Sequence, residues 1–146
     1  MNNTILQLAN TVDDFQLIRS QPIDWETRPA PGKWSKKELI GHLIDSAHIN
    51  LQRFIRCTYE ENFKLTYEQD AWIAAQHYQE ADINELFDLW TLLNKQIIRV
   101  LKNYPAERLG VSCFKNDNVL EPQLHTVVWL ADDYLRHLHH HQQQIK

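Results

Sequence analysis

Apolar residues recur every three or four positions along five stretches of this 146-residue chain. An α-helix advances about 100° per residue, so this spacing gathers the apolar residues on one side and predicts a helix with one buried face. Glycine, which disfavours helix interiors, occurs only three times. The predicted helices cover residues 4–20, 36–59, 67–79, 83–104 and 122–145.

Local signals mark where three of these helices begin. Ser35 and Glu38 have the spacing of a capping box, in which each side chain bonds a backbone N–H of the first turn. Thr66 and Gln69 form a weaker pair of the same kind before the short third helix. Asp82 is a favourable capping residue before the fourth. These signals support the predicted boundaries.

The segment between the fourth and last helices is polar. Pro105 ends the fourth helix, and Pro122 suits the first turn of the last one. Residues 106–121 predict a loop with a turn at 115–118, in which a short hairpin could form. We therefore predict an all-α fold, a four-helix bundle with one short additional helix, and expect residues 1–146 to form a single domain.

Bulk properties argue against several classes of function. The net charge is −4 and no basic stripe occurs, which argues against nucleic acid as a partner. No apolar run approaches the about 18 residues of a membrane span, and the N-terminus lacks the pattern of a secretory signal. Cys57 and Cys113 lack a C-x-x-C spacing, which favours free thiols in a reducing compartment. We expect a soluble, cytoplasmic protein without a membrane partner.

Four of the last ten residues are histidines: His137, His139, His140 and His141. A purification tag would be an uninterrupted run, whereas Leu138 separates these and the helical pattern continues through them. His137 and His141 are four positions apart and follow the apolar stripe, so they point inward or along the margin of the core. His139 is predicted to face solvent, and His140 lies between the two directions.

An inward pair of imidazoles needs polar partners, and one metal ion can satisfy both rings. The same spacing supplies two zinc ligands in H-x-x-x-H motifs. A third ligand would come from another helix, and His42, close to the buried stripe of the second helix, is the leading candidate. Spacing alone leaves two alternatives open: hydrogen-bonded structural histidines, or an exposed tail with incidental metal affinity.

Several other side chains are candidates for this site. Glu38, Asp45 and Asp133 lie about one turn from these histidines and could accept their second N–H. For Glu38 and Asp133, a solvated carboxylate at the helix margin is the competing interpretation. Tyr134 could bond a substrate or simply belong to the core.

Tryptophan and arginine side chains add further candidates. Trp34 and Trp72 are the tryptophans expected to line a pocket. Arg53 and Arg56 could attract an anionic small molecule, or could be ordinary surface charges.

Three short motifs carry a resemblance. They are "WSKKELIGHLIDS" at 34–46, "YEQDAW" at 67–72 and "HLHHHQQQI" at 137–145. In this order they resemble the DinB-like superfamily, particularly its YfiT-like branch of metal-dependent hydrolases. The positions that match the pattern are Trp34, Ser35, His42, Leu43, Asp45, Ser46, His137, His140, His141 and Ile145.

The resemblance implies a four-helix bundle in which His42, His137 and His141 hold one divalent metal ion, nickel or zinc. It makes Asp45 the preferred carboxylate beside a ligand and His140 a supporting residue. Members are often dimeric, so a homodimer is expected. Some relatives are S-transferases that use the metal to activate a low-molecular-weight thiol, such as bacillithiol or mycothiol.

Three neutral histidines leave positions open on a divalent ion, which is the catalytic arrangement. Such a site can lower the pKa of bound water towards about 7, giving hydrolysis, or hold a thiolate, giving transfer to an electrophile. No glutamate follows a ligand as in H-E-x-x-H, which argues against a peptidase. We expect a metal-dependent enzyme acting on a small molecule. The alternatives are a non-catalytic metal-binding or stress-response bundle, and a structural helical protein with incidental histidines.

Overall fold

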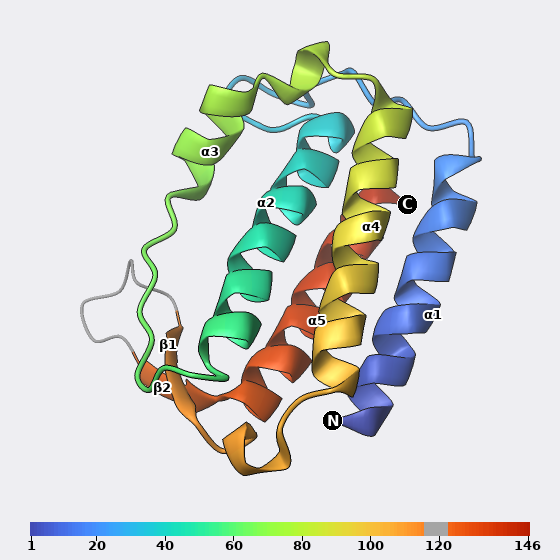
Figure 1. Ribbon diagram of the computed structural model, residues 1–146. Helices are drawn as coiled ribbons and strands as arrows, with labels where there is room; N and C mark the ends of the chain where they lie inside the picture. Colours follow the sequence, from blue (N-terminus) through green and yellow to red (C-terminus); the bar gives the residue numbers. More distant parts are fainter. Residues whose placement is uncertain (116–122) are drawn as a thin grey trace.

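Four long helices pack side by side in the computed structural model, which describes residues 1–115 and 123–146 (Figure 1). A short helix, two 3-10 turns and an antiparallel two-stranded hairpin complete the described chain. The elements are α1 (Asn2–Arg19), α2 (Lys36–Arg56), α3 (Gln69–Gln76), η1 (Tyr78–Glu80), α4 (Ile83–Lys102), η2 (Ala106–Arg108), β1 (Ser112–Lys115), β2 (Gln123–Thr126) and α5 (Val127–Ile145). The predicted all-α four-helix bundle with one short additional helix is confirmed, and the hairpin is a minor addition.

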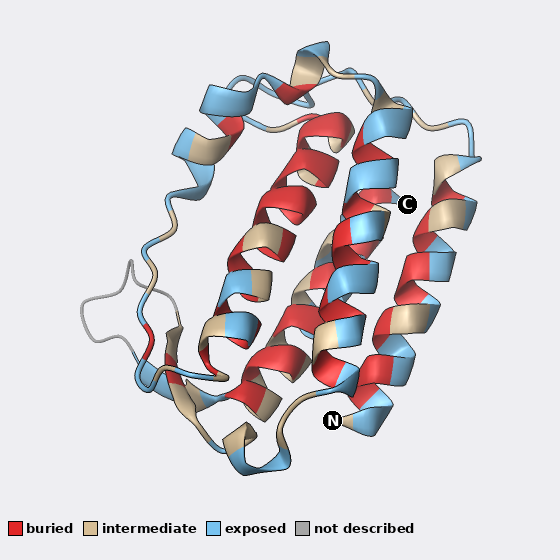
Figure 2. Ribbon diagram, in the orientation of Figure 1, coloured by how far each residue is buried: buried red, intermediate tan, exposed pale blue. Residues whose placement is uncertain are grey.

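The apolar stripes form the core between the helices (Figure 2). α2 differs from the other helices because α3, α4, α5 and η1 all pack against it. It is therefore buried on most of its surface, and several of its buried residues are polar or ionisable. Polar groups inside a bundle are costly unless they find partners, so α2 is the helix on which a functional site is most expected.

Two of the three predicted helix starts are present. The Ser35 hydroxyl accepts a hydrogen bond from the backbone N–H of Glu38, and the Glu38 carboxylate accepts one from that of Ser35. Asp82 caps α4 by accepting from the backbone N–H groups of Asn84 and Glu85. The pairing of Thr66 with Gln69 is wrong, because α3 begins at Gln69 itself and no side chain caps it.

The last helix begins later than predicted. Residues Gln123–Thr126 pair with β1, and α5 starts at Val127 with the Thr126 hydroxyl as its cap. The start at Pro122 is therefore wrong for the helix, since the four following residues are a strand. Pro122 itself and positions 116–118 of the predicted turn lie outside the described residues.

Both cysteines are buried free thiols, as predicted. Although they are distant in sequence, the Cys113 thiol of β1 lowers the pKa of Cys57 at the end of α2, and it donates to the Phe63 carbonyl at 3.3 Å. Among the described helices, none has both the length and the apolar character that crossing a membrane requires.

Candidate metal centre

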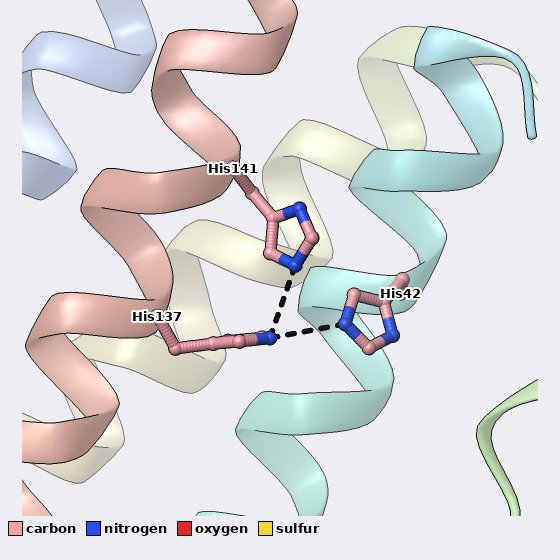
Figure 3. A group of neighbouring side chains, drawn as sticks. All are labelled: His42, His137 and His141. Atoms are coloured by element: carbon pink, nitrogen blue, oxygen red, sulfur yellow. Dashed lines mark hydrogen bonds between the residues drawn. The ribbon is translucent and has the colours of Figure 1, made fainter.

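Three histidines from two helices converge at one point (Figure 3). His42 comes from α2, and His137 and His141 come from successive turns of α5. One ring nitrogen of each lies within 4.8 Å of the other two. The His137 Nε2 is 3.0 Å from the His42 Nε2 and 3.1 Å from the His141 Nε2. The structure thus brings together the three residues that the sequence singled out, hereafter the three-histidine cluster.

The outer nitrogen of each ring has its own polar neighbour. The Nδ1 of His141 lies 2.6 Å from the Gln144 Oε1, which can only accept, so this Nδ1 carries the hydrogen. The Nδ1 of His42 is 3.4 Å from the Tyr67 hydroxyl, and that of His137 is 3.4 Å from the Ser46 hydroxyl. With the hydrogens on Nδ1, three Nε2 lone pairs point at one another, an arrangement that a cation between them would stabilise.

The spacing of these nitrogens fits one bound ion. Nitrogens at about 2.0–2.1 Å from a common metal lie about 2.9–3.4 Å apart for octahedral to tetrahedral angles. The two contacts of the His137 Nε2, 3.0 and 3.1 Å, fall within that range. Neutral imidazoles suit divalent transition metals, and three ligands leave positions open. The cluster can therefore hold a catalytic rather than a closed structural ion.

Burial keeps these rings neutral. It lowers the pKa of His42 from 6.5 to about 4, with a further contribution from His141. It lowers the pKa of His137 from 6.5 to about 3, with contributions from both neighbouring rings. The pKa of His141 is lowered by burial as well. Because only the neutral ring ligates metal, the cluster is in its binding form at neutral pH.

The stability of the metal-free protein is expected to fall as the pH drops below about 6.5. The unfolded chain then takes up protons that the buried rings resist, so acid favours unfolding until the folded pKa values are reached. His42, 3% exposed, accounts for on the order of 2 kcal/mol between pH 6.5 and 5. The free energy of unfolding, measured with urea at a series of pH values between 7.5 and 5, reports this change.

His42→Gln should lose less stability than wild type over that range, because the variant lacks the buried titrating ring. His139→Gln, altered at an exposed position of the same helix as His137, is the matched control and should follow wild type. Parallel losses in wild type and His42→Gln would show that burial of His42 is not the cause.

The predicted carboxylates have different partners from those expected. Asp45 is buried, which raises its pKa, and it accepts hydrogen bonds from the Tyr78 hydroxyl (2.6 Å) and the Gln76 amide (2.7 Å). Among the described residues its Oδ2 has no hydrogen-bond partner. Asp45 therefore fastens η1 and α3 to α2 instead of orienting a histidine. Glu38 closes the capping box and pairs with Arg28.

Asp133 also bonds other groups, since its carboxylate pairs with Lys115 and Arg136. The Tyr134 hydroxyl donates to Asn94 at 2.7 Å, and burial raises its pKa. Tyr134 thus belongs to the core, although it borders the inner cavity described below. His140 is exposed, and its ring lies 5.0 Å from that of His141. Each of these side chains is near the cluster without pointing a polar atom into its centre.

The two predicted tryptophans lie on the α3 side of the cluster. The Trp34 ring is 5.0 Å from the His42 ring. Trp72 packs edge-on against Tyr67, whose ring is parallel to that of His42 at 6.5 Å. Trp34 therefore packs directly on His42, whereas Trp72 packs on Tyr67, which in turn faces His42.

Two cavities border the cluster. The inner cavity has a volume of about 440 Å³ and reaches His42, His137 and His140. The second cavity, of about 790 Å³, reaches His141 and Gln144 and has Trp34 and Leu39 in its wall. Small molecules can therefore approach the histidines from two sides.

Sequence reasoning missed three side chains that touch the outer nitrogens: Ser46, Tyr67 and Gln144. Helical spacing could have found Gln144, which follows His141 by three positions. It also places Ser46 on the His42 face of α2, but the ring that Ser46 contacts is that of His137 in α5. Tyr67 precedes α3 in an irregular segment whose path no periodicity predicts.

Comparison with known proteins identifies a matching family and a solved structure with a similar fold. The sequence model of the DinB superfamily matches residues 10–145. Among solved structures, the chain is similar to YfiT from Bacillus subtilis, with a TM-score of 0.86 and 20% identity, covering 99% of this chain and 82% of that one. YfiT is described as a probable metal-dependent hydrolase with an unusual four-helix bundle topology. No curated protein sequence matches significantly. At this identity, the likeness to YfiT shows the fold alone.

Proposed function

The chain belongs to the DinB superfamily, and on that premise we propose that it is a metal-dependent enzyme acting on a small molecule. His42, His137 and His141 would hold one divalent ion, nickel or zinc. The observation that carries the proposal is the convergence of three Nε2 atoms beside a cavity. The name of the similar structure, a probable metal-dependent hydrolase, supports the same class of chemistry.

The chain's own residues prepare this site for catalysis. Tyr67, Ser46 and Gln144 hold the outer ring nitrogens and so direct the inner ones to a single point. Trp34 covers one side of His42 and limits access of water there. When bound, the ion would supply a Lewis acid with open positions, able to polarise an ester or to bind an anionic nucleophile.

Hydrolysis is the first candidate reaction, and thiol transfer is the second. Transfer needs two organic substrates at the same centre, whereas hydrolysis needs one substrate and water. The presence of cavities on both sides of the cluster supports the transfer alternative. A non-catalytic metal-binding bundle would keep the histidines without turnover.

Turnover by the reconstituted protein tests the proposal. Untagged protein is stripped with a chelator, reloaded with one equivalent of nickel or zinc, and assayed with p-nitrophenyl esters. A second assay follows conjugation of low-molecular-weight thiols to an epoxide or an alkyl halide. We expect activity that requires the metal and is lost in His137→Ala but kept in His139→Ala. Ester cleavage without thiol would identify a hydrolase, and thiol-dependent conjugation a transferase. Bound metal without turnover in either assay would contradict the proposed enzyme.

A further inference from the structure

A polar face continues from the three-histidine cluster along α2. Ser46, Asn50 and Arg53 follow His42 at intervals of four, four and three residues, so they lie on the same side of the helix. All three are buried, Arg53 being only 7% exposed, and all three line the inner cavity. Apolar side chains would pack this face of a bundle at lower cost, and its polar lining suits a cavity that admits a polar ligand.

The inner cavity extends towards the hairpin. Along α2 it passes from His42 to Arg53, and along α5 from His137 back to Asp133. Because these helices are antiparallel, both directions lead away from the cluster to the end where β1 and β2 lie (Figure 1). Lys115 of β1 lines the cavity there. One end of the cavity is therefore the cluster, and the other is bordered by cationic side chains.

Cations outnumber carboxylates in this lining. Asp133 is the sole carboxylate among the described residues that border the inner cavity, and it pairs with both Lys115 (2.5 Å) and Arg136 (3.0 Å). One carboxylate between two cations leaves one positive charge among these three side chains.

The rim cations are also held in place. The Lys115 ammonium lies 5.2 Å from the centre of the Trp129 ring, and the Arg136 guanidinium lies 5.3 Å from it. These contacts and the shared ion pair with Asp133 restrict both side chains before a ligand arrives. A preorganised cationic rim binds an anion at lower entropic cost than free surface lysines do.

The geometry points to a carboxylate-binding subsite formed by Lys115 and Arg136 at the end of the inner cavity away from the cluster. The ligand is a small molecule whose carboxylate binds there and whose reacting group lies at the three-histidine cluster. This inference rests on the proposed function for the reacting end only. Guanidinium and ammonium groups give charge-assisted hydrogen bonds to carboxylates, and the volume of about 440 Å³ suits a small acid.

A short acid is long enough to extend from the three-histidine cluster to the rim cations. Asp133, which holds Lys115 and Arg136, is one helical turn from His137, a rise of about 6 Å. Arg53 is farther, about 16 Å along α2 from His42. Short ligands would therefore meet the rim cations, and longer ones would extend along the polar face of α2.

A matched pair of thiols tests the subsite. Cobalt(II)-loaded protein is titrated with 3-mercaptopropionate and with 3-mercapto-1-propanol, and the thiolate-to-cobalt absorption band reports binding. The two probes have equal length and differ only in the carboxylate. We expect the acid to bind about tenfold more tightly than the alcohol, with a preference that declines as salt is added. Lys115→Gln and Arg136→Gln should bring the ratio towards one and leave binding of the alcohol unchanged.

Arg56→Gln is the matched control. Arg56 follows Arg53 by three residues on the same helix, but it pairs with Glu60 and does not line the cavity. The variant should keep the wild-type ratio. Equal binding of the two thiols by wild type would overturn the subsite while leaving the metal centre intact.

Failure to retain cobalt would instead count against the proposed function. In that case glutarate and 1,5-pentanediol are compared by calorimetry on the metal-free protein. Preference for glutarate that is lost in Lys115→Gln and kept in Arg56→Gln supports the subsite, and absence of that preference overturns it.

Discussion

Replacing His137 by alanine is expected to weaken binding of nickel or zinc by at least about a hundredfold. Residues that only orient metal ligands contribute tenfold to a hundredfold to affinity, and a ligand itself contributes more. His137 is the central member of the cluster, since its Nε2 is the atom that contacts both other rings. Metal content per chain after dialysis, followed by competition with a chelator of known affinity, measures the loss.

The same substitution should remove the stabilisation that metal gives to the fold. A ligand that binds only the folded state at a thousand times its Kd raises the free energy of unfolding by about 4 kcal/mol. Urea unfolding of wild type with and without metal should show a difference of this order, and His137→Ala should show almost none.

His139→Ala is the control for both measurements. The His139 side chain is exposed, and its Nε2 lies 3.1 Å from the Thr11 hydroxyl of α1, away from the cluster. Metal retained by His137→Ala at the wild-type level but lost from His139→Ala would show that the cluster is not the site. Loss in both would indicate a diffuse site formed by the C-terminal histidines.

Helical periodicity predicted the architecture because it is a local property. Helical spacing puts Leu8 and Phe15 on one face of α1 whatever packs against them, and both are buried. The same reasoning placed His137 and His141 at the core margin and His139 in solvent. His42 could be nominated from its stripe, and the resemblance strengthened that choice. Its distance from His137 depends on how α2 meets α5, 95 residues apart in sequence.

The failures of sequence reasoning share one cause, which is contact between distant segments. The start of α5 was misplaced because residues Gln123–Thr126 pair with β1, and a four-residue strand has too little periodicity to reveal itself. Asp45 was assigned to a histidine because it lies about one turn from His42 and belongs to the motif that carries the resemblance. Its partners come from α3 and η1, and the loop that brings Tyr78 to Asp45 has no pattern in the sequence.

Gly41→Ala is expected to destabilise the protein by about 2–4 kcal/mol, although the exchange in an ordinary helix interior stabilises by about 1 kcal/mol. A Cβ at this position of α2 would lie 2.2 Å from the Tyr78 Cδ2 and 2.5 Å from two further ring atoms. The ring cannot move aside freely, because it is 5% exposed and its hydroxyl donates to the buried Asp45 at 2.6 Å. Relief of the clash therefore requires breaking that bond or shifting α2 beside His42.

Urea unfolding of three variants separates this clash from a general effect of removing glycine. Gly110→Ala is the control, since among the described residues beyond its two chain neighbours no atom lies within 4 Å of its added Cβ, and it should stay within about 0.5 kcal/mol of wild type. Tyr78→Ala destabilises by itself, because it leaves a cavity and deprives Asp45 of a donor. Adding Gly41→Ala to that variant should cost nothing further, since the ring is gone.

Wild-type stability in Gly41→Ala would contradict the close packing of η1 on α2. Additive losses of stability in the double variant would show that the cost does not come from the contact with Tyr78. Because Gly41 adjoins His42, the single variant should also bind metal less tightly, which would show that this packing positions the three-histidine cluster.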